Sequence, residues 1–148
     1  ARLKGGIATI RIGASSSIEM REKKERLDDA LNATKAALEE GIVIGGGNTL
    51  LWISNNMSDK TPLFLKRALT SPAGALLDNS NMSASDFDDI SNSANTLEFG
   101  FNALTGDFGS LKEAGVYDPV KVTKNSFLAA MSIAQLFYST DVAVLVEE

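Results

Sequence analysis

A long amphipathic helix that ends at a glycine is the feature of this sequence that most constrains its fold. Small and apolar residues recur at helical spacing along one stripe, made of Leu27, Ala30, Leu31, Thr34, Ala37 and Leu38. Ser16 and Glu19 form the S-x-x-E pattern of a capping box before this stripe. Gly41 suits the left-handed residue that commonly ends a helix. The sequence therefore predicts one helix over residues 17–40, about 35 Å long.

Three consecutive glycines, Gly45 to Gly47, follow a short apolar link, and a second helix is predicted to start at Asn48. Free backbone N–H groups at such a helix start can face an anion. A run of glycines by itself is more often a plain loop, and this one lacks the lysine of a phosphate-binding Walker loop. Both interpretations stay open from the residues alone.

The remaining segments predict further helices and two strands at the ends of the chain. Alternating residues over 5–13 and β-branched residues over 141–148 are typical of strands. A helix is expected from about Ala103 to Ala114, and another from Asp118 as N-cap with Pro119 at the first helical position. This last helix is apolar over most of its circumference, which predicts a central core helix.

Composition narrows the classes of function. The 148 residues are 44% hydrophobic and 22% charged, with net charge −5, as in ordinary soluble domains. The negative charge argues against nucleic acid and anionic membranes as partners. Absence of cysteine and histidine removes disulfides, thiolate metal sites and the commonest general base. Asp86, Asp88 and Asp89 lack the glycine and terminal glutamate of a calcium loop, so we expect no metal site.

Asp28 and Asp29 lie side by side in the predicted long helix, where aspartate is a poor helix former. An aspartate pair on a helix is usually only a solvated surface. A catalytic carboxylate is the alternative, because a chain without histidine must use carboxylates, lysine, hydroxyls or a bound ion.

Two long segments resemble one known family. The stretch GGIATIRIGASSSIEMREKKERLDDALNATKAALEEGIVIGGG is similar to the intermediate domain of group I (bacterial-type) chaperonins. The stretch FGFNALTGDFGSLKEAGVYDPVKVTKNSF resembles the second half of their equatorial, ATP-binding domain. The resemblance implies a mainly α (α+β) fold, with a long lever helix, a helical equatorial half-domain and short strands at the two ends. It divides the chain into the end of an apical segment (1–4), an intermediate segment (5–41) and an equatorial half (42–148).

The resemblance also implies roles for six residues. Asp29 matches the aspartate that orients the water attacking the γ-phosphate of ATP, and Gly46 matches a residue whose backbone lies against the nucleotide. Asn102, Ala103 and Leu104 match the turn that contacts adenine, although the family usually has alanine at the position of Leu104. Asp118 matches the carboxylate that binds the ribose hydroxyls; a plain helix cap is the alternative.

The family's phosphate-binding loop and magnesium-binding carboxylates have no counterpart here. We therefore expect ATP with magnesium to be the cofactor of the longer protein, and this chain alone to bind ATP weakly or not at all. Whether the chain is an enzyme is left open by its sequence.

For the longer protein, the resemblance implies ATP-dependent folding of non-native proteins in a double ring. Its partners would be other subunits, a co-chaperonin and unfolded clients, in the bacterial cytoplasm or an organelle matrix. A non-enzymatic assembly or scaffold module, or a divergent paralogue without ATPase activity, is the alternative. A freestanding hydrolase lacks a nucleophile–base pair.

Overall fold

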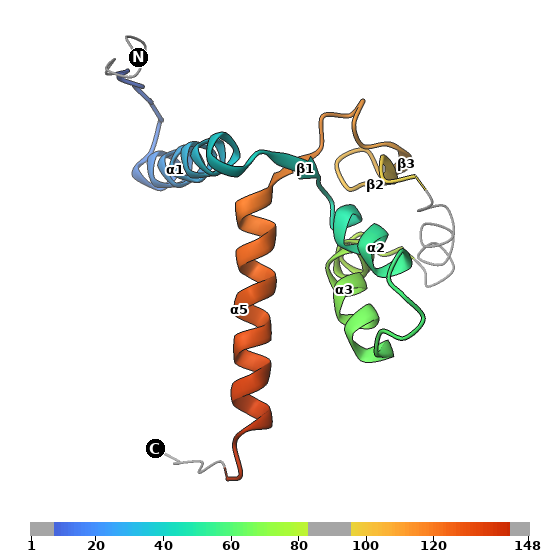
Figure 1. Cartoon of the computed structure of the whole chain (residues 1–148). Coiled ribbons are helices and arrows are strands. Elements are labelled where there is room, and N and C mark those ends of the chain that lie inside the picture. The colour runs from blue at the N-terminus through green and yellow to red at the C-terminus, as the bar shows by residue number, and fades with distance from the viewer. Residues whose placement is uncertain (1–7, 83–95, 143–148) are drawn as a thin grey trace, which may run out of the picture.

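The computed structural model describes residues 8–82 and 96–142. Helices and short strands follow one another along the chain (Figure 1): α1 (Ser17–Glu40), β1 (Ile42–Ile44), α2 (Asn48–Asn55), α3 (Leu63–Asn79), β2 (Phe99–Asn102), β3 (Asp107–Ser110), β4 (Tyr117–Pro119) and α5 (Val120–Tyr138). The mainly helical fold class predicted from the sequence is confirmed.

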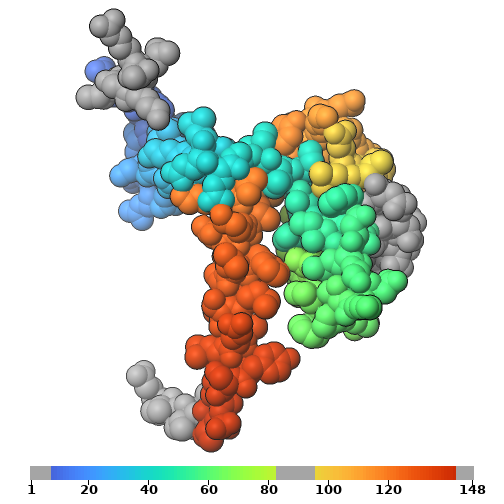
Figure 2. Space-filling model, viewed as in Figure 1, coloured from blue at the N-terminus to red at the C-terminus, as the bar shows by residue number. Residues whose placement is uncertain are grey.

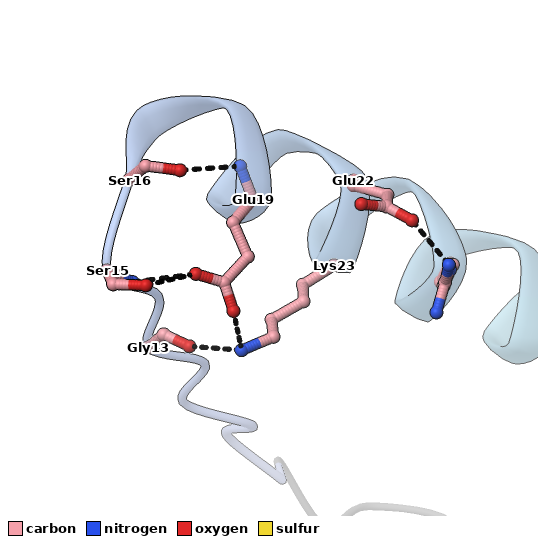
Figure 3. Close-up of polar contacts among 7 residues, drawn as sticks. Gly13, Ser15, Ser16, Glu19, Glu22 and Lys23 are labelled. Atoms are coloured by element: carbon pink, nitrogen blue, oxygen red, sulfur yellow. Dashed lines mark hydrogen bonds and ion pairs between the residues drawn. The ribbon is translucent and has the colours of Figure 1, made fainter.

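Helix α1 begins with a network of side-chain hydrogen bonds (Figure 3). Ser16 Oγ accepts a hydrogen bond of 3.2 Å from the N–H of Glu19, as expected for an N-cap. The Glu19 carboxylate accepts hydrogen bonds from the N–H and hydroxyl of Ser15, at 2.9 and 2.6 Å. Lys23 forms an ion pair with Glu19 at 2.7 Å and donates to the carbonyl of Gly13. The N-cap at Ser16 that the sequence predicts is therefore present, and Ser15 adds to it.

The other end of α1 leads into a two-stranded antiparallel ribbon. Gly41 has φ +87° and donates its N–H to the carbonyl of Ala37, so the helix ends where the sequence predicts. Strand β1 then pairs with β4, with Val43 opposite Asp118. The N–H of Val120 donates to the carbonyl of Gly41 at 3.1 Å, which joins the end of α1 to the start of α5.

A small core lies between α2, α3 and the hairpin of β2 and β3. Leu51 is fully buried, and it clusters with Ala73, Leu77 and Phe101. Gly47 lies directly against the backbone of α3, because a Cβ placed on it would be 2.7 Å from Ala73 N. The start of α2 is thus fixed by close backbone packing.

The helix predicted from Ala103 to Ala114 is wrong. Strands β2 and β3 pair with Phe101 opposite Phe108, and the chain reverses at Gly106, which has φ +78°. Aromatic residues at alternate positions and the turn residues between them are a hairpin signal. Pairing between the two strands therefore outweighs the helix propensity of the single segment.

The last helix forms as predicted but does not lie in the core. No residue of α5 is buried, and Leu136, Phe137 and Tyr138 are 67%, 76% and 91% exposed. Figure 2 shows the C-terminal half of α5 projecting from the other described elements. Within the described ranges, no element extends far enough to cover it, so the core-helix prediction is wrong for this chain.

The predicted strand near the N-terminus is also wrong where it can be judged, since residues 8–13 form no strand. Strand formation needs a partner for the backbone groups, and none of the described residues pairs with this segment. Most of the predicted C-terminal strand, residues 143–148, lies outside the described residues, as do residues 83–95 with Asp86, Asp88 and Asp89.

Substituting Gly47 by alanine should destabilise the chain more than the same change at Gly106. Both glycines have positive φ, at +73° and +78°, which costs an alanine about 1–2 kcal/mol. Only Gly47 is also crowded, whereas a Cβ on Gly106 meets nothing within 4 Å. We expect losses of roughly 3 and 1 kcal/mol in the free energy of unfolding, measured with urea. Equal losses would show that Gly47 is not closely packed.

Protonation of Glu19 should loosen the start of α1. Hydrogen bonds from Lys23 and Ser15 lower the pKa of Glu19 from 4.5 to about 2. A lowered pKa in the folded state means that the stabilisation is present above pH 4.5 and is lost as the pH falls towards 2. The protection factors of the first-turn amides, which correct for the intrinsic pH dependence of exchange, should therefore fall over this range, and Glu19→Gln should abolish this fall. Glu25→Gln, on the same helix, is the control and should leave it unchanged.

Candidate functional site

Three segments that are distant in the sequence meet at the Gly45–Gly47 turn. A Cβ placed on Gly45 would lie 3.1 Å from Asp118 Oδ1, and one placed on Gly46 would lie 3.6 Å from the carbonyl oxygen of Phe101. The N–H of Gly45 donates to the carbonyl of Val116 at 3.0 Å, which extends the β1–β4 ribbon to this turn. The structure therefore brings Gly46 close to the strand that carries Asn102, and Gly45 close to Asp118.

The hairpin turn is shaped by Asn102. Its side-chain oxygen accepts a hydrogen bond of 3.0 Å from the N–H of Leu104, and its carbonyl accepts one of 2.9 Å from the N–H of Gly106. This arrangement leaves Ala103 and Leu104 exposed at the tip, with Leu104 93% exposed. The tip thus presents a small apolar surface on a side-chain-anchored turn.

Asp118 lies in β4 and does not cap α5. The N-cap of that helix is Pro119, and no side chain caps the helix. The N-cap interpretation of Asp118 is therefore wrong, because pairing of Asp118 with Val43 holds it one residue earlier. Partial burial raises the pKa of the Asp118 carboxyl above its ordinary value.

A cleft of about 360 Å³ opens beside Asp118. It lies between α5 and the pair α2 and α3, and Gly47, Leu69 and Phe127 are among its lining residues. Asp118 is the one ionisable side chain among the residues that line it. A partly buried carboxylate at the end of an apolar cleft can accept hydrogen bonds from hydroxyl groups of a ligand.

Asp29 lies apart from this group. It is exposed in the middle of α1, and at 1.5 Å per residue its Cα is about 18 Å along the helix axis from Gly41. Figure 1 shows α1 leaving the β1–β4 ribbon on the side away from α2 and the hairpin. The structure places Gly46 against Phe101, the neighbour of Asn102 in β2, and Gly45 beside Asp118, whereas Asp29 lies on α1 away from them.

Two ion pairs join the end of α1 to the start of α5. Lys121 pairs with Glu39, and Lys124 pairs with Glu40. The hydrogen bond between Lys121 and Glu39 lowers the pKa of the glutamate and raises that of the lysine. Our sequence reasoning missed these contacts, although acidic residues before Gly41 and lysines after Pro119 are the signal that could have shown them.

Neither a cluster of metal ligands nor a membrane-spanning helix is found in the part of the chain that the structure describes. In residues 8–82 and 96–142, no three His, Cys, Asp or Glu side chains gather as metal ligands. None of the described helices is long and apolar enough to cross a membrane. What the arrangement offers is a glycine turn for anionic or close backbone contact, a carboxylate for hydroxyl groups, and a hairpin tip.

Comparisons with known proteins identify relatives of the chain. A model of the TCP-1/cpn60 chaperonin family matches residues 1–147. Among solved structures, the chain is similar to one described as the crystal structure of a group III chaperonin in the open state, with a TM-score of 0.79 and 22% sequence identity. The similarity covers 90% of this chain and 30% of that chain. At this identity the structural likeness establishes the fold, and the chain spans about 30% of the chaperonin's length.

Replacing Asp118 by asparagine should stabilise the fold near neutral pH. Because burial raises the pKa of Asp118, the folded state favours the protonated form, and stability falls as the pH rises from the ordinary aspartate pKa through the raised one. A neutral amide at this position carries no such penalty, so the thermal midpoint of Asp118→Asn should exceed that of the wild type at pH 7. The difference should vanish at about pH 3, below the ordinary aspartate pKa. Asp107→Asn, at an exposed position, controls for net charge; a midpoint of Asp118→Asn below that of the wild type would contradict the prediction.

Proposed function

The chain belongs to the TCP-1/cpn60 chaperonin family, and from this premise we propose that it is the C-terminal portion of an ATP-dependent group I chaperonin subunit. The longer protein would assemble into a ring with other subunits and assist the folding of non-native proteins. The group I assignment rests on the sequence segments from Gly5 to Asn48 and from Glu98 to Ser126. Residues 5–41 would form the intermediate segment and residues 42–148 the equatorial half.

The observation that carries this proposal is the convergence at the Gly45–Gly47 turn. Three separate segments carry Gly46, Asn102 and Asp118. Gly46 lies against Phe101, the neighbour of Asn102, and a Cβ placed on Gly45 would lie 3.1 Å from Asp118 Oδ1. Their chemistry suits a nucleotide: a backbone without side chains for close approach, and a carboxylate for ribose hydroxyls. The exposed turn of Ala103 and Leu104 would contact the base.

ATP would supply the phosphoryl group whose hydrolysis drives the cycle of the longer protein. The residues described here fit the nucleoside end, whereas they include no carboxylate cluster to hold magnesium. We therefore assign the metal and the phosphate-binding loop to the part of the longer protein outside this chain. Alone, the chain is expected to hydrolyse no ATP.

Asp29 is the residue that we assign to catalysis. Helix α1 is a single 24-residue element with a capped start and a glycine end, so it can carry a carboxylate as a rigid arm. Phosphoryl transfer needs a positioned water and charge neutralisation more than covalent catalysis, and an aspartate can orient that water without histidine. Delivery of Asp29 to the nucleotide would require α1 to rotate about Gly41, with rearrangement of the ion pairs beside it.

Substituting Asp29 by alanine in the complete subunit should abolish ATP turnover while leaving ATP affinity unchanged. Loss of a water-orienting carboxylate is expected to lower the rate by about 10²–10⁴-fold. The matched control is Asp28→Ala, which removes the same charge from the neighbouring position on the helix. Measurement of steady-state phosphate release and of the Kd for ATP separates the two effects. Full turnover in Asp29→Ala would refute the assigned role.

A scaffold module is the second candidate. It is favoured by Leu104, which stands where the family usually has alanine, and by the weak resemblance between residues 54 and 97. Calorimetric titration of the complete subunit with ATP distinguishes the candidates. Tight, magnesium-dependent binding excludes the scaffold interpretation, and absence of binding excludes the ATPase.

A further inference from the structure

Asn48, the first residue of α2, is a buried polar side chain that the proposed site does not yet use. It is 2% exposed, directly after the Gly45–Gly47 turn. Its side chain does not cap its own helix, since the N-cap is Gly47 and no side-chain capping bond is made. Asparagine has no advantage over an apolar residue at such a position unless its amide is needed.

The amide of Asn48 donates to two backbone carbonyls of a distant segment. Nδ2 lies 2.5 Å from the carbonyl oxygen of Leu97 and 3.0 Å from that of Phe99. On the opposite edge, β2 pairs with β3, and the carbonyl of Glu98 accepts from Leu111 N–H at 2.8 Å. Alternate carbonyls of a strand point to the same edge, so Asn48 holds the edge of β2 that β3 leaves unpaired.

Gly46 continues the same contact along that edge. The carbonyl of Phe101, the next in the alternate series after Leu97 and Phe99, lies against Gly46. Asn48 and Gly46 are two residues apart, and together they follow the edge of β2 towards the hairpin tip. The glycine turn and the hairpin are thus joined along a row of three carbonyls.

Burying the Asn48 amide leaves one of its polar atoms without a hydrogen bond from the described part of the chain. Oδ1 of Asn48 is buried and has no donor among the described residues. Space around the amide is also closed, because a Cβ on Gly100 would lie 3.2 Å from Oδ1 and 2.7 Å from Leu111 Cδ1. An unpaired buried acceptor destabilises the fold. The benefit of asparagine at position 48 must therefore come from the two hydrogen bonds that its Nδ2 donates.

We propose that Asn48 is a positioning residue that fixes the hairpin tip relative to the Gly45–Gly47 turn. Through this tether it sets the separation between Gly46 and the segment from Asn102 to Leu104, the two sides of the nucleotide site. Asn48 itself is too deeply buried to touch a ligand. Its effect on nucleotide binding rests on the proposed function, whereas its effect on the hairpin does not.

The test uses two variants of the complete subunit and a matched control. Asn48→Ala and Asn48→Val both remove the donors, and valine fills more of the space than alanine while its methyl groups end short of the two carbonyls. Ser54→Ala is the control: Ser54 is 4% exposed on the same helix, and its hydroxyl donates to the carbonyl of Lys66 at 3.0 Å, away from the hairpin.

Two readouts are measured at matched stability: amide hydrogen exchange of residues 99–110 and the Kd for ATP. Both Asn48 variants should accelerate exchange in the hairpin at least about tenfold and weaken ATP binding about tenfold, because about 1.4 kcal/mol corresponds to one decade. Ser54→Ala should change neither, although it lowers the thermal midpoint.

The outcomes separate the tether from the function. Hairpin exchange in the Asn48 variants equal to that of Ser54→Ala overturns the tether, and a loss confined to Asn48→Ala shows a cavity effect and overturns it as well. Unchanged ATP affinity with faster hairpin exchange overturns the positioning role. Absence of ATP binding by the wild-type subunit overturns the proposed function, while hairpin exchange still decides the tether.

Discussion

The pairing of β1 with β4 is the interaction on which the rest of this structure depends. Only three residue pairs form it, from Ile42 with Pro119 to Ile44 with Tyr117. Backbone hydrogen bonds extend it at both ends, through Gly41 with Val120 and Gly45 with Val116. Helices α1, α2 and α5 all leave from this ribbon (Figure 1). A register slip of one residue would turn the side chains of one strand to the other face and separate Asp118 from Gly45.

The ion pairs beside the ribbon affect the orientation of α1 relative to α5 more than they affect the stability of the fold. The pairs of Lys121 with Glu39 and Lys124 with Glu40 are exposed, and exposed ion pairs contribute little to folding. Their geometry nevertheless ties the base of α1 to the base of α5 in one orientation. Because the backbone bond of Val120 to Gly41 lies between the same two helices, movement of α1 would disturb all three contacts together. Helix α1, which carries Asp29, is therefore oriented by two exposed ion pairs and one backbone hydrogen bond beside the β1–β4 ribbon.

The candidate site consists of the glycine turn, the hairpin and Asp118, and the described residues add no cluster of metal ligands to it. Close packing places the glycine turn against the hairpin and Asp118, and the amide of Asn48 donates a hydrogen bond to the segment that leads into the hairpin. No residue of α5 is buried. The chain spans about 30% of the length of the group III chaperonin to which it is similar, and in our proposal the remainder of the site belongs to the longer protein.

Local signals in the sequence determined the bounds of α1 and the position of α5, but not the fold of residues 103–114. The Ser16 cap and Gly41 set the bounds of α1 because capping and helix ending depend on residues within one turn. The apolar pattern after Pro119 likewise predicted α5, and the nucleotide-binding roles of Gly46, Asn102 and Asp118 stay predictions. Tertiary structure alone decided that residues 99–110 form a hairpin, that Asp118 pairs in a strand instead of capping a helix, and that α5 stays exposed. It also gave Asn48 its partners 49 and 51 residues away. Strand pairing and burial depend on which distant segments meet, and no local pattern carries that information.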